Sequence, residues 1–224
     1  MLKIIKTLFQ QGCRTLPFPK GNAPSFPARY RGCPIIARDP ESLDIGKITF
    51  IPDSDVRYSN DYRMAAAKRE HLIITKNEKV LAAALNREML RIFGRSLKLR
   101  QVSAGGCNSC ELDLNVLNTP VFALGRFGIQ FVASPRHADG IVVTGPISRN
   151  MREALLKTYE AMPGPKIVIA VGSCAISGGI FLGSPEVSGG LETIIPVDLF
   201  IPGCPPHPLT ILDGLLRLLG KIKS

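Results

Sequence analysis

Two short runs of this chain contain only apolar residues, and they constrain its fold more than any other feature. The runs are Ile141-Val142-Val143 and Ile167-Val168-Ile169-Ala170-Val171. A strand without polar residues is covered on both faces, as the central strands of a parallel sheet are when helices pack on either side. The sequence therefore predicts an α/β domain built around a parallel sheet.

The segments around these runs alternate in the order that such a sheet requires. The predicted strands are 97–102, 129–133, 140–144, 166–171 and 197–201. Ser148 is suited to cap a helix over 149–161, and Pro208 is suited to open a closing helix with an apolar stripe. This alternation predicts strands that run parallel and are joined by crossover helices.

The beginning of the chain has a different character. In residues 2–9 the apolar side chains fall on one helical face and Lys3 and Lys6 on the other, which predicts a short amphipathic helix. Five prolines follow, at positions 17, 19, 24, 27 and 34. Because proline lacks an N–H donor and fixes its φ angle, this stretch is predicted to be an extended arm.

Between this arm and the sheet, the sequence predicts two weak strands, 47–51 and 71–74, which would pair antiparallel. Thr75 and Glu78 form a predicted capping box that opens a helix ending near Ile92. We divide the chain into an arm and small module over 1–75, a linking helix over 76–96 and the sheet domain over 97–224.

Charge and cysteine content narrow the class of protein. The formal net charge is +10, and lysine and arginine crowd the stretch up to Arg100. No nucleic-acid-binding motif accompanies this charge, so we interpret it as a docking surface and expect no nucleic-acid partner.

The chain begins with no secretory pattern, so its six cysteines are expected to be reduced, in the cytoplasm. No apolar run approaches the ~20 residues that span a bilayer.

Four of these cysteines lie in turns rich in glycine or proline. They are Cys107 and Cys110 in Gly106-Cys107-Asn108-Ser109-Cys110-Glu111, Cys174 in Gly172-Ser173-Cys174, and Cys204 in Pro202-Gly203-Cys204-Pro205-Pro206. All three turns directly follow a predicted strand. Ligand sites of open α/β sheets gather at the carboxyl ends of the strands, so we expect the four thiols to converge there.

Four converging cysteines have three interpretations. They suit a cubane iron–sulfur cluster, in which each iron takes one thiolate. They match the ligand number of a tetrahedral zinc site, or they are buried thiols without a metal. Zinc ribbons usually supply two paired Cys-x-x-Cys knuckles, whereas Cys174 and Cys204 are thirty positions apart. The nearby glycines permit close backbone approach, which favours the many sulfide acceptors of a cluster.

Together with Ser134-Pro135-Arg136-His137-Ala138-Asp139, these turns resemble the small subunit of membrane-bound, energy-converting [NiFe] hydrogenases over about 97–220. The homologous cluster-binding subunit of respiratory complex I is similar, but typically has adjacent cysteines in the first motif. The resemblance implies a flavodoxin-like fold with helices on both faces of the sheet. It also implies one proximal [4Fe–4S] cluster on Cys107, Cys110, Cys174 and Cys204, facing a large catalytic subunit.

A second resemblance concerns the arm. Pro27-Ala28-Arg29-Tyr30-Arg31-Gly32 and Asn60-Asp61-Tyr62-Arg63-Met64-Ala65 resemble the two-cluster ferredoxin subunit of such complexes, but the repeated Cys-x-x-Cys motifs are missing. Cys13 and Cys33 do not replace them and are expected to be free thiols. The prediction is a degenerate ferredoxin-like module that lost its clusters; the alternative is an unrelated basic linker.

Three residues near the motifs have two interpretations each. Glu111 resembles the glutamate that passes protons in hydrogenases of this type; it would otherwise be an acid in the first turn of a helix. Arg136 and His137 would line the large-subunit interface or tune the cluster through hydrogen bonds; otherwise they would cap or pair locally next to Asp139. Glu111 is thus the candidate proton relay, and His71 and His207 receive no role.

The resulting expectation is an electron-transfer subunit, inactive by itself, of a [NiFe]-hydrogenase-type complex at the cytoplasmic side of the membrane. Its expected partners are the large catalytic subunit, a ferredoxin-like subunit and membrane subunits that hold it there. One alternative is the same subunit in a quinone oxidoreductase or in a related complex without nickel. Another is a zinc-stabilised binding module, which would be colourless.

Overall fold

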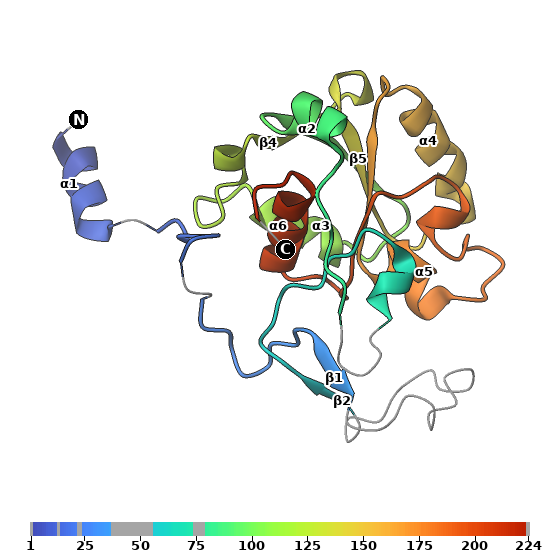
Figure 1. Ribbon diagram of the computed structural model, residues 1–224, viewed down its shortest axis with the longest axis horizontal. Coiled ribbons are helices and arrows are strands. Elements are labelled where there is room, and N and C mark those ends of the chain that lie inside the picture. Colours follow the sequence, from blue (N-terminus) through green and yellow to red (C-terminus); the bar gives the residue numbers. More distant parts are fainter. Residues whose placement is uncertain (1, 13, 22–23, 37–55, 74–78, 223–224) are drawn as a thin grey trace.

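The computed structural model describes residues 2–12, 14–21, 24–36, 56–73 and 79–222. Figure 1 shows their arrangement. The helices are α1 (Leu2–Gln11), α2 (Arg87–Phe93), α3 (Ser109–Val116), α4 (Arg149–Glu160), α5 (Ser173–Ser177) and α6 (Pro208–Leu218). The strands are β1 (Pro34–Ile36), β2 (Val56–Tyr58), β3 (Leu97–Ser103), β4 (Ile129–Phe131), β5 (Gly140–Thr144), β6 (Ile167–Val171) and β7 (Leu199–Ile201).

The predicted parallel sheet is confirmed. Its strand order is β4-β3-β5-β6-β7, and every neighbouring pair runs parallel. The first strand of the domain, β3, therefore lies between the second and the third, which is the strand order of flavodoxin-like folds. In such a sheet the chain reverses its winding direction between β3 and β5, and a crevice opens there at the carboxyl ends of the strands.

Each face of the sheet is covered by its own helices. Ile167, Ile169 and Val171 of β6 belong to the core cluster that includes residues of α3 and α6, whereas Val168 and Ala170 pack with residues of α4 and α5. Figure 1 shows α6 and α3 on one side of the strands and α4 on the other. Because side chains alternate between faces along a strand, this double cover explains why residues 141–143 of β5 and all of β6 are apolar.

The closing helix α6 is buried on all sides rather than along one stripe. Pro208 occupies its first turn as predicted, and His207 precedes it as the cap, with Nδ1 accepting from Leu209 N at 3.1 Å. The arm contributes to the same core cluster, because Leu16 and Phe18 pack against it. Part of the arm thus lies on its own domain.

The amphipathic helix predicted at the start of the chain is present as α1. The strand predicted at 71–74 and its antiparallel pairing were wrong. Residues 69–72 form a 3-10 helix with i→i+3 bonds such as His71 N to Lys68 O, so the strand predicted at 71–74 is absent from its described part. The antiparallel pair is formed by β1 and β2 instead. The strand predicted at 47–51 lies outside the described residues.

The predicted linking helix is shorter than expected. Thr75 and Glu78 lie outside the described residues, and α2 begins only at Arg87, where Asn86 caps it by accepting from Met89 N at 2.9 Å. Residues 79–86 are not helical, because their N–H groups bond elsewhere: Ala82 N to Ala65 O and Leu85 N to Leu218 O. Apolar spacing alone did not reveal these long-range bonds.

A segment before position 75 also enters the core of the sheet domain. Ala65 and Ala66 are fully buried, and Ala66 forms an antiparallel bridge with Phe200 of β7. Contacts therefore cross the boundary that the sequence suggested at 75, and that boundary stays a prediction, as does the ferredoxin-like origin of residues 1–75. In the described part of the chain, no helix has the length and apolarity needed to cross a membrane.

Candidate metal centre

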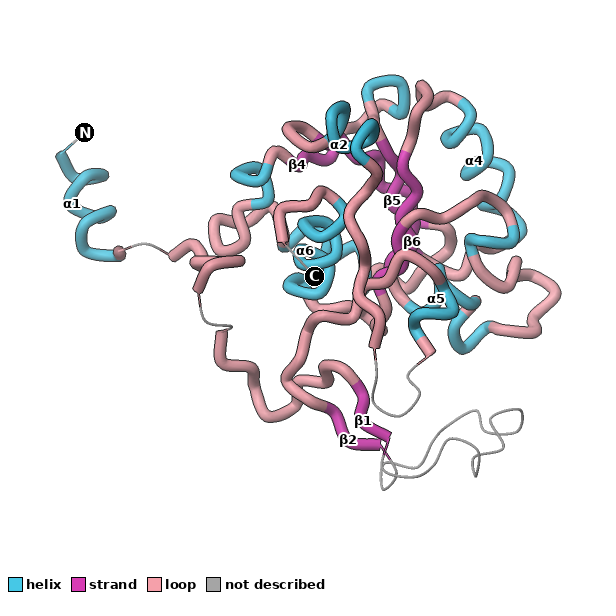
Figure 2. The backbone as a smooth tube through the Cα atoms, viewed as in Figure 1, coloured by secondary structure: helices cyan, strands magenta, loops and turns pink. Residues whose placement is uncertain are grey.

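The four predicted cysteines lie at the carboxyl ends of the strands. Cys107 is in the turn between β3 and α3, and Cys110 is in the first turn of α3. Cys174 is in α5, directly after β6, and Cys204 follows β7. Figure 2 shows α5 continuing from the sheet at this end. Between the first two thiols, Asn108 adopts a left-handed conformation (φ 71°), which asparagine tolerates better than most residues.

The thiols are close enough to influence each other electrostatically. Burial raises the pKa of the Cys110 thiol to about 12, with further contributions from the charges of Glu111 and the other three cysteines. Burial also raises the pKa of Cys174, and the charges of Cys204 and Cys107 raise it further. These four groups would bind as thiolates only where a positively charged centre offsets their mutual repulsion.

Two glycines leave the space that the sulfur atoms occupy. A Cβ atom on Gly172 (φ 90°) would lie 2.6 Å from Cys110 Sγ, and one on Gly179 (φ 58°) would lie 2.8 Å from Cys174 Sγ. Any other residue would both strain the backbone and collide with a thiol. The backbone therefore approaches the cysteine side chains closely, as the glycine-rich turns predicted.

The loops of Cys174 and Cys204 are bonded to each other. Ser173 donates to Gly203 O from its backbone N at 2.8 Å and from Oγ at 3.1 Å, and Gly172 N donates to Ile201 O at 2.9 Å. These bonds fix the turn after β7 relative to the turn after β6. Two thiols that are far apart in sequence are thus held in one constellation.

The donor set fits a cluster whose irons bind one thiolate each. In the described residues, no group of three or more His, Cys, Asp and Glu side chains is arranged to hold a metal ion. A cubane places its ligands farther apart than a mononuclear site, because each thiolate reaches a different iron. Four coupled thiols and a glycine cradle are what such a cluster requires of its protein.

Glu111 is buried beside the thiols, in the first turn of α3. It accepts hydrogen bonds from Ser103 Oγ and Thr144 Oγ1, both at 2.6 Å, so it ties the ends of β3 and β5 to the helix. Burial opposes ionisation of Glu111, but the two hydroxyl groups outweigh it and keep its pKa below the ordinary value. Sequence reasoning missed Ser103 and Thr144, although both stand at strand ends where ligands gather.

Other candidate residues lie away from this constellation. Arg136 and His137 are exposed in a 3-10 helix before β5, near Asp139, whose Oδ2 accepts from Lys98 N at 2.7 Å. They are thus at the amino end of the sheet, opposite the cysteines. Cys33 is half-buried in the arm, where burial raises its pKa and its Sγ lies 3.8 Å from Pro34 O. Cys13 lies outside the described residues.

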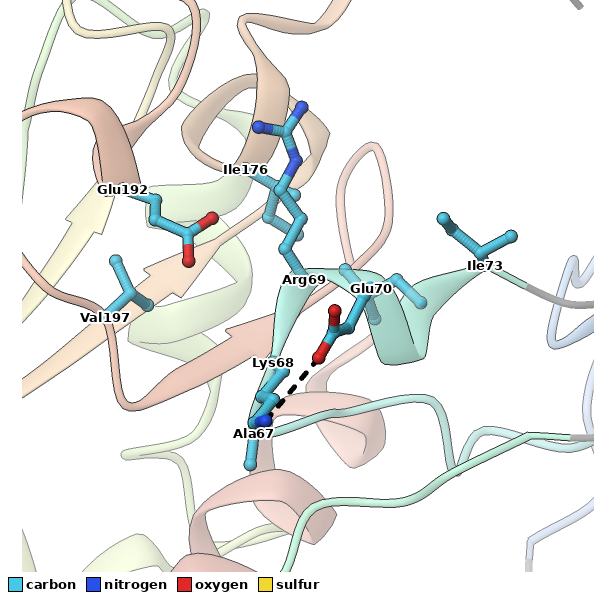
Figure 3. A pocket seen from close by; sticks show the side chains of 9 residues that line it. Ala67, Lys68, Arg69, Glu70, Ile73, Ile176, Glu192 and Val197 are labelled. Atoms are coloured by element: carbon cyan, nitrogen blue, oxygen red, sulfur yellow. Dashed lines mark ion pairs between the residues drawn. The ribbon is translucent and has the colours of Figure 1, made fainter.

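A separate hollow of about 750 Å³ opens beside α5 (Figure 3). Its walls include Lys68, Arg69, Glu70 and Glu192, with Ile176 of α5 at its side. Lys68 and Glu70 form an exposed ion pair at 3.5 Å, drawn as the dashed line. Exposed ion pairs of this kind contribute little to stability, and the hollow has none of the four cysteines in its described walls.

Comparisons with known proteins agree with this fold. Over 135 residues the chain is 43% identical to a probable membrane-bound hydrogenase subunit of Pyrococcus furiosus, covering 60% of this chain and 81% of that protein. It is 43% identical to formate hydrogenlyase subunit 7 of Escherichia coli, over 63% of this chain and 56% of that one. An NADH-quinone oxidoreductase subunit of Heliobacterium modesticaldum is 42% identical over 54% of this chain and 70% of that protein.

A solved structure and a family model extend the comparison. A chain of the membrane-bound sulfane sulfur reductase, an archaeal respiratory membrane complex, superposes with a TM-score of 0.53 at 33% identity. It covers 61% of this chain and 75% of that chain. The family model of the NADH ubiquinone oxidoreductase 20 kDa subunit matches residues 107–218, a segment that contains all four cysteines. The chain therefore belongs to the family of the NADH ubiquinone oxidoreductase 20 kDa subunit.

Proposed function

We propose that this chain is the electron-transfer small subunit of a membrane-associated [NiFe]-hydrogenase-type complex. One proximal [4Fe–4S] cluster, held by Cys107, Cys110, Cys174 and Cys204, would connect it to a large catalytic subunit. The observation that carries the proposal is the convergence of these four thiols at one edge of the sheet. The membrane-bound hydrogenase subunit and formate hydrogenlyase subunit 7 among its relatives support it.

The chain's own residues determine how the centre would be held. When bound, the cluster supplies a centre that takes up and releases one electron at a time. Cys110 and Cys174 are partly buried and would hold it from the protein side, whereas Cys107 and Cys204 are exposed. One side of the site is thus open toward a partner, so electrons would leave without crossing this domain.

The surface next to the site suits a large protein partner. Ile180, Phe181 and Leu182 follow the Cys174 turn, and 80%, 46% and 66% of their surfaces are exposed. Apolar residues clustered on a surface mark interaction sites. We assign this patch to the large catalytic subunit; the ferredoxin-like and membrane subunits are further proposed partners. Nickel, where present, would belong to the large subunit.

The second candidate is the same subunit in a complex without nickel, such as a quinone oxidoreductase. It is favoured by the 33% identity to the chain of the sulfane sulfur reductase complex and by the relatives named as NADH-quinone oxidoreductase subunits. Both candidates use the same four cysteines. They differ in the large subunit, where two Cys-x-x-Cys motifs would bind nickel.

Purification of the native complex, with metal analysis and a hydrogen-dependent dye-reduction assay, tests the proposal. The first candidate predicts iron, nickel and dye reduction by hydrogen. Iron and sulfide without nickel, and no reaction with hydrogen, would select the second candidate. A colourless complex with zinc bound stoichiometrically to this chain would contradict both, because zinc thiolates do not absorb visible light.

Glu111 is the proposed proton relay near the cluster, and Glu111→Gln tests it. The amide keeps an oxygen that accepts from Ser103 and Thr144, so the fold and iron content should be unchanged. Because the amide carries no proton at neutral pH that it can transfer, turnover should fall by the ~10²–10⁴-fold typical of a lost general acid or base. Turnover equal to that of the parent would leave Glu111 as a structural link between two strands and α3.

For its location, we propose that the chain is peripheral on the cytoplasmic side of the membrane, held by partner subunits and by α1. Figure 1 shows α1 standing away from the sheet domain. Its Ile4, Ile5 and Phe9 are exposed, Lys3 and Lys6 are the charged residues of the helix, and no acidic residue precedes Asp39. This composition suits the surface of an anionic bilayer.

Ile5→Asp with Phe9→Asp tests this attachment. Two carboxylates on the apolar face should reduce co-flotation of the purified chain with phosphatidylglycerol vesicles to the level of protein without vesicles. The matched control is Ile180→Asp, which changes an exposed apolar residue elsewhere and should float like the parent. If the parent does not float, or if the double variant floats equally, α1 does not bind lipid.

A further inference from the structure

The segment 26–33, here called the strap, lies against the loop that carries Cys204. The rings of Phe26 and Tyr30 stack with centroids 4.0 Å apart and an interplanar angle of 15°. Both meet the imidazole of His207 edge to face, with centroid distances of 5.4 and 5.3 Å and angles of 79° and 81°. These are favourable geometries for aromatic pairs, so three rings from two distant segments form one cluster.

His207 connects this cluster to the cysteine loop. It follows Cys204 by three positions and caps α6 through its bond with Leu209 N. The other end of the loop is fixed by the bonds from Ser173 to Gly203 O. Cys204 itself is exposed and sits between these two anchors. The strap therefore contacts the short segment that joins Cys204 to α6.

The strap is itself anchored. Gly32 N donates to Ser59 O at 3.1 Å, Cys33 N donates to Asp61 O at 2.8 Å, and Ser59 N donates to Cys33 O at 3.0 Å. A Cβ atom on Gly32 would lie 2.5 Å from Ser59 O, so the two backbones approach closely. Backbone hydrogen bonds to residues 59–61 thus fix the strap in place without a bound metal.

A cleft of about 430 Å³ runs between the strap and the loop. Its walls include Arg31, Tyr58, Ser173 and Cys204, and none of the described residues that line it is acidic. The Arg31 guanidinium lies 5.2 Å from the centre of the Tyr58 ring, a cation–π contact that holds its charge near the cleft. A cluster with four thiolate ligands is an anion, and its reduction potential responds to nearby charge and to solvent access.

We propose that the strap supports the fourth ligand of the cluster: Phe26, Tyr30 and His207 are positioning residues for Cys204, and Arg31 supplies a cation that favours the reduced state. The proposal rests on the cluster assignment made above. It gives a function to a segment outside the matched family region, which begins at residue 107.

The test compares variants of the full chain after anaerobic loading with iron and sulfide. Phe26→Ala with Tyr30→Ala should lose the cluster to an iron chelator about tenfold faster than the parent, because the rings that hold His207 are gone. Tyr30→Phe keeps the aromatic ring and should lose the cluster at the parent's rate. The control Tyr159→Ala removes a ring of α4 that contacts Lys166 and packs against the core on the other face of the sheet, so it should also match the parent.

Arg31→Gln tests the charge separately and does not depend on the folding of the double variant. It should lower the reduction potential measured by a redox titration, because a cation that stabilises the reduced cluster is lost, and leave the chelation rate unchanged. Arg152→Gln, at an exposed position of α4, is the control and should keep the parent's potential.

Equal chelation rates in the double variant and the parent, or equal acceleration by Tyr159→Ala, would overturn the positioning role. An unchanged potential in Arg31→Gln would overturn the charge role. These results would leave the cluster assignment intact. A parent chain that takes up no iron and sulfide would contradict the cluster assignment itself and the role of the strap with it.

Discussion

Replacement of Cys110 by serine is expected to remove the iron of this subunit and with it electron transfer through the complex. Cys110 is the thiol most strongly affected by burial and by the other three cysteines, so it occupies the protein side of the constellation. A serine hydroxyl is a much poorer ligand for iron than a thiolate. Iron and acid-labile sulfide should fall to near zero in the variant.

Cys33→Ser is the matched control for this experiment. Cys33 is also a partly buried cysteine with a raised pKa, but it lies in the strap and is not among the proposed ligands. It should retain the parent's iron content and visible absorbance. If Cys110→Ser keeps its iron, or if Cys33→Ser loses it, the assignment of the four ligands is wrong.

The second large effect concerns the ion pair inside α6. Asp213 and Arg217 are almost fully buried, and Arg217 Nε donates to Asp213 Oδ2 at 2.7 Å. Asp213→Ala removes the carboxylate and leaves a guanidinium charge in the core with one partner fewer. The free energy of unfolding should fall by about 3–5 kcal/mol, measured by chemical denaturation of the full chain.

An exposed pair with the same spacing provides the comparison. Glu153 and Lys157 on α4 are also four residues apart, at 2.7 Å, but most of each side chain is exposed. Glu153→Ala should cost no more than about 0.5 kcal/mol. Asp213→Leu with Arg217→Met should recover most of the lost stability, since it removes both charges. A small effect of Asp213→Ala would mean that water reaches the Arg217 side chain.

The sheet and the cysteine constellation were predictable because both follow from local rules. Continuous apolar runs identified β5 and β6, and the rule that ligands gather at strand ends placed Cys174 and Cys204 together. The same rule applied to polar residues would have found Thr144, which ends the apolar strand β5 and bonds Glu111. The positions of candidate site residues were thus predictable where those residues directly follow or end a strand.

The remaining part was not predictable because its structure depends on distant partners. Residues 79–86 have helical spacing, but Ala82 and Leu85 bond to Ala65 and Leu218 and form no helix. His207 likewise packs against the rings of Phe26 and Tyr30, which are far away in sequence. Propensity is a weak guide where a segment has little core of its own and takes its shape from the domain it covers.

Anaerobic analysis of iron, zinc and acid-labile sulfide in the purified chain tests the central claim most directly. The cluster assignment predicts about four irons and four sulfides for each chain, with broad visible absorbance that bleaches on reduction. Stoichiometric zinc without iron or sulfide, or twice the predicted iron, would contradict the assignment of a single [4Fe–4S] cluster to Cys107, Cys110, Cys174 and Cys204.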